Sequence, residues 1–223
     1  TITTNKTSLE QIKKFFDKND WKPLPFQIES WKAYLNGENG IIQVPTGCGK
    51  TYAALMGPLS KLNNCRKKSG LNILLITPLK ALSRDLKNAI DSATKYFDEE
   101  ITVGIRNGDT SPYEKKKQIL NPPHILITTP ESLSLLLSNK ESKKIFKNLF
   151  SIIIDEWHEL MGSKRGNQCE LCLSWLRGNK KDLQIWAMSA TIGNIEEAGR
   201  AIIGIKANTP KIIRTNIRNL LDN

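Results

Sequence analysis

Short apolar runs alternate with helix-like patterns along most of the chain. The runs that we expect to be strands are 41–44, 73–76, 101–103, 125–127, 151–154 and 184–187. Between them, apolar residues recur every three or four positions and predict helices at 50–62, 79–96, 112–120, 130–137, 165–177 and 194–203. Strands that are apolar along their whole length, each followed by a helix, are typical of a parallel sheet buried on both faces. The pattern therefore predicts an α/β fold, with a mostly parallel sheet and helices on both faces.

The two ends of the chain depart from this alternation. Ser8 precedes apolar residues at helical spacing, as a capping residue does at the start of an amphipathic helix. A second helix is expected from about 26 to 35, ended by Asn36-Gly37. Residues 210–213 are apolar enough for one more strand. We divide the chain into an N-terminal helical extension (1–20), a central domain (21–205) and a segment leading away from it (206–223).

The charge balance changes the picture of what the domain binds. Lys and Arg number 33 against 22 Asp and Glu, which gives a formal net charge of +11. Such an excess favours a polyanionic partner, because cations that neutralise phosphates release bound counterions. A lysine-rich solvated surface gives the same composition, and Lys115-Lys116-Lys117 is interpreted as such a helix face, with direct strand contact as the alternative.

The cysteines indicate a reducing, cytoplasmic location rather than a disulfide framework. Cys169 and Cys172 have the spacing of half a zinc site, but no second pair or His cluster completes four ligands. We therefore expect this pair to pack one helix. No basic-then-apolar leader opens the chain and no apolar run approaches about 18 residues, so neither a signal peptide nor a membrane span is predicted.

The segment PTGCGKT at positions 45–51 has the chemistry of a phosphate-binding loop. Its glycines let the backbone approach an anion, and the helix that follows directs its positive end toward the same anion. Lys50 is expected to reach the outer phosphates, and Thr51 to offer its hydroxyl to Mg²⁺. Val44 stands where the general pattern has its first Gly. The predicted nucleotide-binding residues of the loop are Thr46, Gly47, Cys48, Gly49, Lys50 and Thr51.

Two adjacent carboxylates end a later apolar strand. Asp155 is expected to hold the magnesium ion, while Glu156 orients and deprotonates the attacking water. With Lys50, these are the predicted catalytic residues. The alternative is that both carboxylates are ordinary polar residues at a strand end, with no catalytic role.

Two further side chains are candidates near the nucleotide. His158 is a candidate polar link between the nucleotide site and Ser189-Ala190-Thr191. Gln27, upstream of the phosphate loop, is placed either to recognise an adenine edge or as a surface helix residue.

In this order, the segments resemble the first RecA-like domain of a superfamily 2 DEAD/DEXH-box helicase, from about residue 21 to 205. The matching segments are Phe26-Gln27, the phosphate loop, 77–82, 129–133, 155–158 and 189–191. DEWHEL at 155–160 followed by GSKRG at 162–166 is similar to the Lhr (large helicase-related) group, and most to the ligase-associated DEXH-box DNA helicases. Trp157 departs from DEAD-box RNA helicases, which have Ala there.

The resemblance implies a two-lobed motor that binds ATP and Mg²⁺, moves along single-stranded DNA and acts in DNA repair. It also implies a second RecA-like lobe with an arginine finger, toward which residues 206–223 lead, and association with a DNA ligase and a nuclease. We find no counterpart of that lobe, so we expect the chain alone to bind nucleotide weakly and hydrolyse it poorly.

The resemblance also assigns residues to the nucleic acid and to coupling. The expected nucleic-acid contacts are Thr77, Pro78, Lys80, Arg84, Arg106, Thr129 and Glu131. The expected coupling residues are His158, Ser189, Ala190 and Thr191. Arg106, Thr110 and Arg165 have a second interpretation as structural salt-bridge partners.

Two other functions stay open from the residues alone. The same lobe can bind RNA instead of DNA. The sequence does not reveal whether a residue contacts the 2′-hydroxyl, so it does not decide between the two. A nucleotide-gated module that binds nucleic acid without translocating is the other alternative, although it does not need Glu156.

Overall fold

One parallel sheet organises the molecule. The computed structural model describes residues 2–65, 68–180, 182–191, 193–204 and 209–215. Within them, seven strands lie in the order β3-β4-β2-β5-β6-β1-β7, and each neighbouring pair is parallel. The strands are β1 (Gly40–Gln43), β2 (Ile73–Ile76), β3 (Val103–Arg106), β4 (Ile125–Thr128), β5 (Ser151–Ile154), β6 (Gln184–Ser189) and β7 (Lys211–Arg214). The predicted α/β fold is confirmed.

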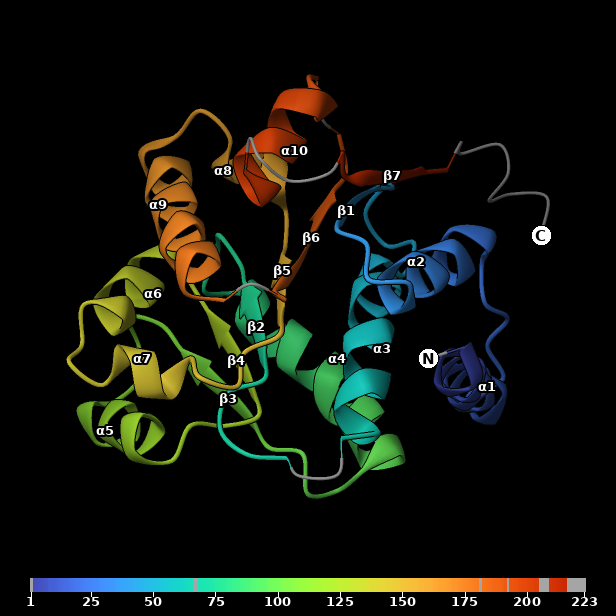
Figure 1. Cartoon of the computed structure of the whole chain (residues 1–223), viewed down its shortest axis with the longest axis horizontal. Helices are drawn as coiled ribbons and strands as arrows, with labels where there is room; N and C mark the ends of the chain where they lie inside the picture. Colours follow the sequence, from blue (N-terminus) through green and yellow to red (C-terminus); the bar gives the residue numbers. More distant parts are fainter. Residues whose placement is uncertain (1, 66–67, 181, 192, 205–208, 216–223) are drawn as a thin grey trace.

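Helices cover both faces of this sheet, as Figure 1 shows. They are α1 (Ile2–Lys18), α2 (Pro25–Leu35), α3 (Lys50–Asn63), α4 (Leu82–Phe97), α5 (Pro112–Leu120), α6 (Pro130–Leu137), α7 (Ser142–Ile145), α8 (Trp157–Leu160), α9 (Lys164–Asn179) and α10 (Ile195–Ile203). None of the helices in the described ranges is both long and apolar enough to cross a membrane.

Alternating strand residues build two separate hydrophobic layers. In β2, Ile73 and Leu75 join the layer formed with α1 to α4, whereas Leu74 and Ile76 join the layer formed with α6 to α10. Successive side chains of a strand point to opposite faces, so a strand buried on both sides has to be apolar throughout. This requirement explains the uninterrupted apolar runs of the sequence.

Helix α1 begins earlier than the capping pattern predicts. It starts at Ile2 and Ser8 lies inside it, so the prediction that Ser8 caps this helix is wrong. The Ser8 hydroxyl is buried and accepts a hydrogen bond from Asn64 Nδ2, 3.0 Å away, beyond the end of α3. A side chain with a tertiary partner is satisfied within a helix, which removes its preference for the cap position.

Both ends of the described chain belong to the same core. Helix α1 contributes Phe15 and Phe16 to the layer shared with α2 to α4. The predicted last strand is confirmed as β7, which pairs with β1 from Gly40↔Lys211 to Gln43↔Arg214. β7 lies within the segment 206–223, so this part of the segment extends the sheet of the central domain.

Strand direction collects the candidate residues at one edge. Because the strands are parallel, their carboxyl ends meet there, and ligands of open α/β sheets bind at that edge. The loops that follow β1, β2, β4, β5 and β6 carry the motifs of the sequence, and the candidate site lies among them.

Candidate nucleotide site and polar groove

The phosphate-binding loop joins β1 to α3. Gly47 and Gly49 have φ angles of 80° and 78°, in the left-handed region that side chains disfavour. Gly49 is the N-cap residue of α3, so the first N–H groups of that helix open toward the loop. An N-terminus of this kind, beside two such glycines, suits an anion such as a triphosphate.

Gln27 supports this loop from α2. Its side chain is only 4% exposed, so its interpretation as a surface helix residue is wrong. Gln27 Nε2 donates to the Gly49 carbonyl (3.1 Å), and Oε1 accepts from the Leu24 backbone N–H (2.9 Å). A Cβ at Gly49 would lie 2.7 Å from Gln27 Nε2, so this contact requires glycine. Recognition of adenine by Gln27 stays a prediction.

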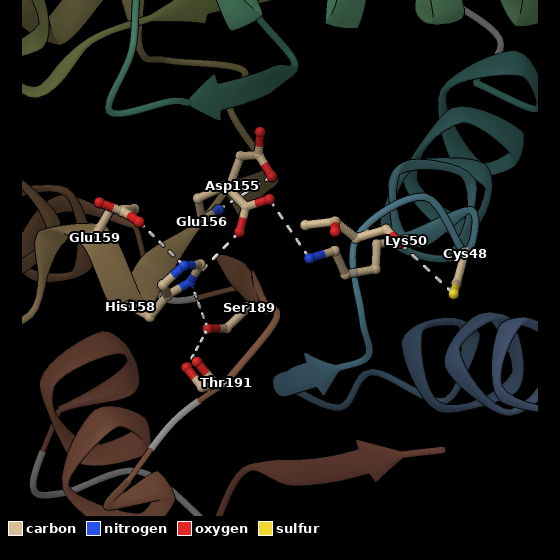
Figure 2. Close-up of polar contacts among 9 residues, drawn as sticks. Cys48, Lys50, Asp155, Glu156, His158, Glu159, Ser189 and Thr191 are labelled. Atoms are coloured by element: carbon tan, nitrogen blue, oxygen red, sulfur yellow. Dashed lines mark hydrogen bonds and ion pairs between the residues drawn. The ribbon is translucent and has the colours of Figure 1, made fainter. Parts of the chain in front are cut away.

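The lysine of the loop faces the carboxylate pair that follows β5. Lys50 Nζ lies 3.5 Å from Glu156 Oε1, and the Lys50 side chain is 7% exposed (Figure 2). Residues 106 positions apart in the sequence therefore meet at one site. A phosphate-binding lysine and a water-orienting carboxylate have to converge in this way to act on one nucleotide.

Asp155 and Glu156 sit in a tight backbone turn at the end of β5. Glu156 has φ 45° and ψ 50°, a left-handed conformation that is uncommon for a residue with a side chain. Its N–H donates to Asp155 Oδ1 (3.0 Å). Burial and the neighbouring Glu156 carboxylate raise the pKa of Asp155 to about 6. The site thus concentrates negative charge where little water solvates it.

This charge fits a divalent cation. Glu156 Oε2 is buried without a hydrogen-bond partner, and a nearby cation would satisfy it. Among the described residues there is no cluster of three or more His, Cys, Asp or Glu that could hold a metal. Magnesium bound to a nucleotide needs fewer protein ligands, because phosphate oxygens and water supply most of its coordination. Asp155, with the Thr51 hydroxyl at the start of α3, fits that requirement.

His158 connects the carboxylates to the end of β6. Its Nδ1 lies 2.9 Å from Ser189 Oγ and 3.4 Å from Glu156 Oε2, and its Nε2 lies 3.3 Å from Glu159 Oε1 (Figure 2). Ser189 Oγ also donates to the Thr191 carbonyl, 2.9 Å away. The structure therefore brings together three of the predicted coupling residues, with Ala190 between two of them.

A second feature of the same edge is a cavity of about 310 Å³, which we call the polar groove. It is lined by Lys80, Arg106, Gly108, Lys115, Thr129, Glu131, Ser132, Leu135 and Arg165. Four of these are predicted nucleic-acid contacts. Thr77 and Pro78, also predicted, are buried and do not line it, and neither does Arg84. The cations and the helix start at Thr129 suit backbone phosphates.

Side chains in and beside the groove already have partners within the protein. Arg165 forms an ion pair with Glu131, and its NH2 lies 3.3 Å from Glu131 Oε2. Arg106 NH1 donates to the Lys115 carbonyl (2.9 Å). Thr110 Oγ1 accepts from the Asn107 N–H (3.0 Å). Of these three residues, only Arg165 forms an ion pair among the described residues, so the salt-bridge interpretation describes Arg165 and not Arg106 or Thr110.

Sequence reasoning missed part of the groove. Gly108, Ser132 and Leu135 are not among the predicted contacts, and Lys115 is predicted to lie on a solvated helix face, with direct strand contact as the alternative. The spacing of Ser132 from Thr129 contains a usable signal, because residues three apart lie on the same face of a helix. Gly108 lies in the loop after β3, and the Lys115 carbonyl of α5 accepts a hydrogen bond from Arg106 NH1 at the end of β3. No local sequence pattern reveals that these segments meet.

Cys169 and Cys172 are packing residues of α9. Both are free and buried in the layer that α9 shares with the sheet. Burial raises the pKa of Cys172 to about 11 and that of Cys169 still further. Neutral thiols in an apolar layer are poor metal ligands, because the thiolate is the ligand form.

Comparisons with known proteins agree with this geometry. A family model described as DEAD/DEAH box helicase matches residues 24–198. The chain is 39% identical over 208 residues to ATP-dependent helicase Lhr-Core of Sulfolobus acidocaldarius, covering 87% of this chain and 24% of that protein. It is 35% identical over 190 residues to ATP-dependent helicase Lhr-Core protein 2 of Thermococcus barophilus, covering 78% and 22%.

A solved structure extends the likeness to three dimensions. Mycobacterium smegmatis helicase Lhr, solved bound to ssDNA and AMP-PNP, matches with a TM-score of 0.84 and 32% identity, over 92% of this chain and 27% of that one. The chain therefore spans about a quarter of the length of these relatives.

Proposed function

This chain belongs to the DEAD/DEAH box helicase family, and we propose that it is the nucleotide-binding lobe of an ATP-dependent DNA helicase that moves along single-stranded DNA. The observation that carries the proposal is the 3.5 Å approach of Lys50 Nζ to Glu156 Oε1. Hydrolysis of a nucleotide needs both a loop that binds phosphates and a carboxylate that positions water, so their proximity indicates that reaction.

In this proposal the chain's residues divide the hydrolytic work. The phosphate-binding loop and the start of α3 hold the triphosphate, and Lys50 contacts its outer phosphates. Glu156 orients the attacking water and accepts its proton. Asp155 and Thr51 hold magnesium, which when bound neutralises charge on the phosphates.

The polar groove is the proposed nucleic-acid surface. Its cations and hydroxyls suit sequence-independent contact with a phosphate backbone, and the net charge of +11 favours a polyanion. The M. smegmatis relative was solved with ssDNA. Action in DNA repair, with a ligase and a nuclease, and a second motor lobe belong to the proposal on family resemblance alone. The free cysteines suit a cytoplasmic location.

Coupling between the two surfaces is assigned to the network around His158. It links Glu156 to Ser189 and so to the chain after β6. A change at the nucleotide that moves Glu156 alters this network first, and the segment at Thr191 follows.

The proposal is tested by Glu156→Gln in the full-length protein. This change keeps the size of the side chain but removes the proton acceptor, so ATP hydrolysis stimulated by single-stranded DNA should fall by about a hundredfold or more. Binding of a fluorescent ATP analogue should persist. Glu196→Gln, an equal charge change at an exposed position of α10, is the matched control.

The same assay separates the alternatives. Turnover measured with single-stranded DNA, duplex DNA and RNA identifies the polymer that stimulates the enzyme. Unchanged turnover in Glu156→Gln contradicts the catalytic assignment, and stimulation by RNA alone contradicts the choice of DNA.

A further inference from the structure

An exposed carboxylate beside the polar groove contacts one of its cations. Asp109 Oδ1 lies 2.8 Å from Lys80 Nζ, and both side chains are exposed. Lys80 follows β2 and Asp109 follows β3, so the contact joins two loops at the same edge of the sheet. Lys80 is one of the cations that line the groove, whereas Asp109 does not line it.

The turn that carries Asp109 is braced by its own hydrogen bonds. The Asp109 N–H donates to Asn107 Oδ1 (3.0 Å), and the Asn107 N–H donates to Thr110 Oγ1 (3.0 Å). A Cβ at Gly108 would lie 2.7 Å from Lys80 Nζ, so glycine lets the turn come close to the ammonium group. The Asp109 carboxylate takes no part in these bonds, which leaves it directed at Lys80 by a turn that does not depend on it.

Asp109 is surrounded by positive charge. Its pKa is lowered by the hydrogen bond and charge of Lys80, and further by the charges of Arg84 and Lys115. The carboxylate therefore remains ionised throughout the neutral range and acts as a counter-ion for these cations. It offers them the same kind of oxygen that a phosphate offers.

The second ion pair of the groove differs in kind. Arg165 contacts both Glu131 oxygens and links α9 to α6. A two-point contact between packed helices is a fixed structural connection. The Lys80–Asp109 pair has one contact and lies in solvent, where an ion pair is weak and readily exchanged.

We propose that Asp109 is a built-in competitor for nucleic-acid phosphate: its carboxylate holds Lys80 until a backbone phosphate displaces it. The inference rests on the proposed function of the groove. It assigns to Asp109 the role of lowering affinity, so that the lobe releases the backbone easily, as repeated movement along a strand requires. The exchange is one oxyanion for another at Lys80, and it breaks no hydrogen bond of the turn.

The test is Asp109→Asn in the full-length protein without nucleotide, with a fluorescein-labelled oligodeoxythymidine and fluorescence anisotropy. The variant keeps the shape of the side chain and removes its charge. We expect binding about two- to fivefold tighter than wild type, the scale of one exposed ion pair. Asp17→Asn, an equal change at an exposed position of α1, should leave the affinity unchanged.

A double-mutant cycle separates competition at Lys80 from a general charge effect. Lys80→Gln alone should weaken binding, and adding Asp109→Asn to it should give no gain. A gain of equal size with and without Lys80, or a gain no larger than that of Asp17→Asn, overturns the proposal. Wild-type protein that binds no oligonucleotide overturns the proposed groove function as well. Urea unfolding of each variant checks that all are equally folded.

Discussion

At the scale of single residues, the carboxylate pair of Asp155 and Glu156 combines two features that cost stability. Asp155 is buried beside a second carboxylate, and Glu156 adopts a left-handed backbone conformation. Strained and desolvated groups of this kind cluster at functional sites, where the surrounding structure holds them in place. The loss of folding stability caused by the buried Asp155 carboxylate can be measured from the pH dependence of unfolding.

We predict that Asp155→Asn stabilises the nucleotide-free protein at neutral pH. Burial and Glu156 raise the pKa of Asp155 from 3.8 to about 6, so the folded state binds this proton more tightly than the unfolded state. The contribution of Asp155 to the free energy of unfolding is therefore most favourable at low pH and is lost as the pH rises toward about 6. At pH 7 the Asn variant should gain on the order of 2 kcal/mol.

Urea unfolding in EDTA at pH 7 and at about pH 4 measures this difference. The gain should shrink toward zero at the lower pH, where Asp155 is protonated in the folded protein. Glu196→Gln, which changes an exposed carboxylate, should show no such trend. An equal gain at both pH values would mean that packing, and not the charge, is responsible.

Residue patterns reveal the chemistry of the site better than its geometry. Lys50, Asp155 and Glu156 are identifiable because their roles require fixed residue types in a fixed order. The burial of Gln27 and the partner of Lys80 cannot be identified from the sequence, because both depend on segments that meet only after folding. Sequence patterns describe neighbours along the chain, whereas these contacts join segments 22 and 29 positions apart.

At the scale of elements, α1 is part of the core. Phe15 is 1% exposed, and its ring lies within 5.3 to 6.2 Å of the rings of Phe16, Trp21, Tyr52, Tyr96 and Phe97. Tyr52 follows Thr51 in α3, and Trp31 Nε1 donates to its carbonyl (3.0 Å). The aromatic cluster thus joins α1 to the helix that begins in the phosphate-binding loop.

We predict that Phe15→Ala lowers the free energy of unfolding by about 3–5 kcal/mol, because it leaves a cavity among five rings. Chemical denaturation followed by circular dichroism measures the loss. Lys14→Ala, at the neighbouring exposed position, should change stability by no more than about 0.5 kcal/mol. Equal effects of the two substitutions would show that α1 is a dispensable extension.

The helices and strands that could be predicted from the sequence are those long enough to show a pattern of apolar residues. Strands buried on both faces follow the apolar runs, and α10 follows the apolar periodicity, since Ile195, Ala198 and Ile202 are among its buried positions. Helices α7 and α8 have four residues each, which is about one turn and too short for a period to appear. Strand β3 lies at 103–106 instead of 101–103, because its register is set by pairing with β4.

At the scale of the whole molecule, the sheet places the proposed nucleotide and nucleic-acid surfaces at one edge. β2, whose following loop carries Lys80 of the groove, lies between β4 and β5. The carboxyl end of β5 carries Asp155 and Glu156, the proposed catalytic pair. One lobe can therefore hold both ligands. The resemblance assigns one further cation, an arginine finger, to a second lobe.

We therefore predict that the 223-residue chain alone hydrolyses ATP at least roughly a thousandfold more slowly than the full-length protein, since an arginine finger contributes on that scale. Single-stranded DNA should not restore the rate, because the missing charge acts on the phosphates and not on the groove. Turnover at saturating ATP, with Glu156→Gln of the same chain as background, measures the difference. Brisk DNA-stimulated hydrolysis by the chain alone would mean that its own residues, among them Lys50, stabilise the transition state without help.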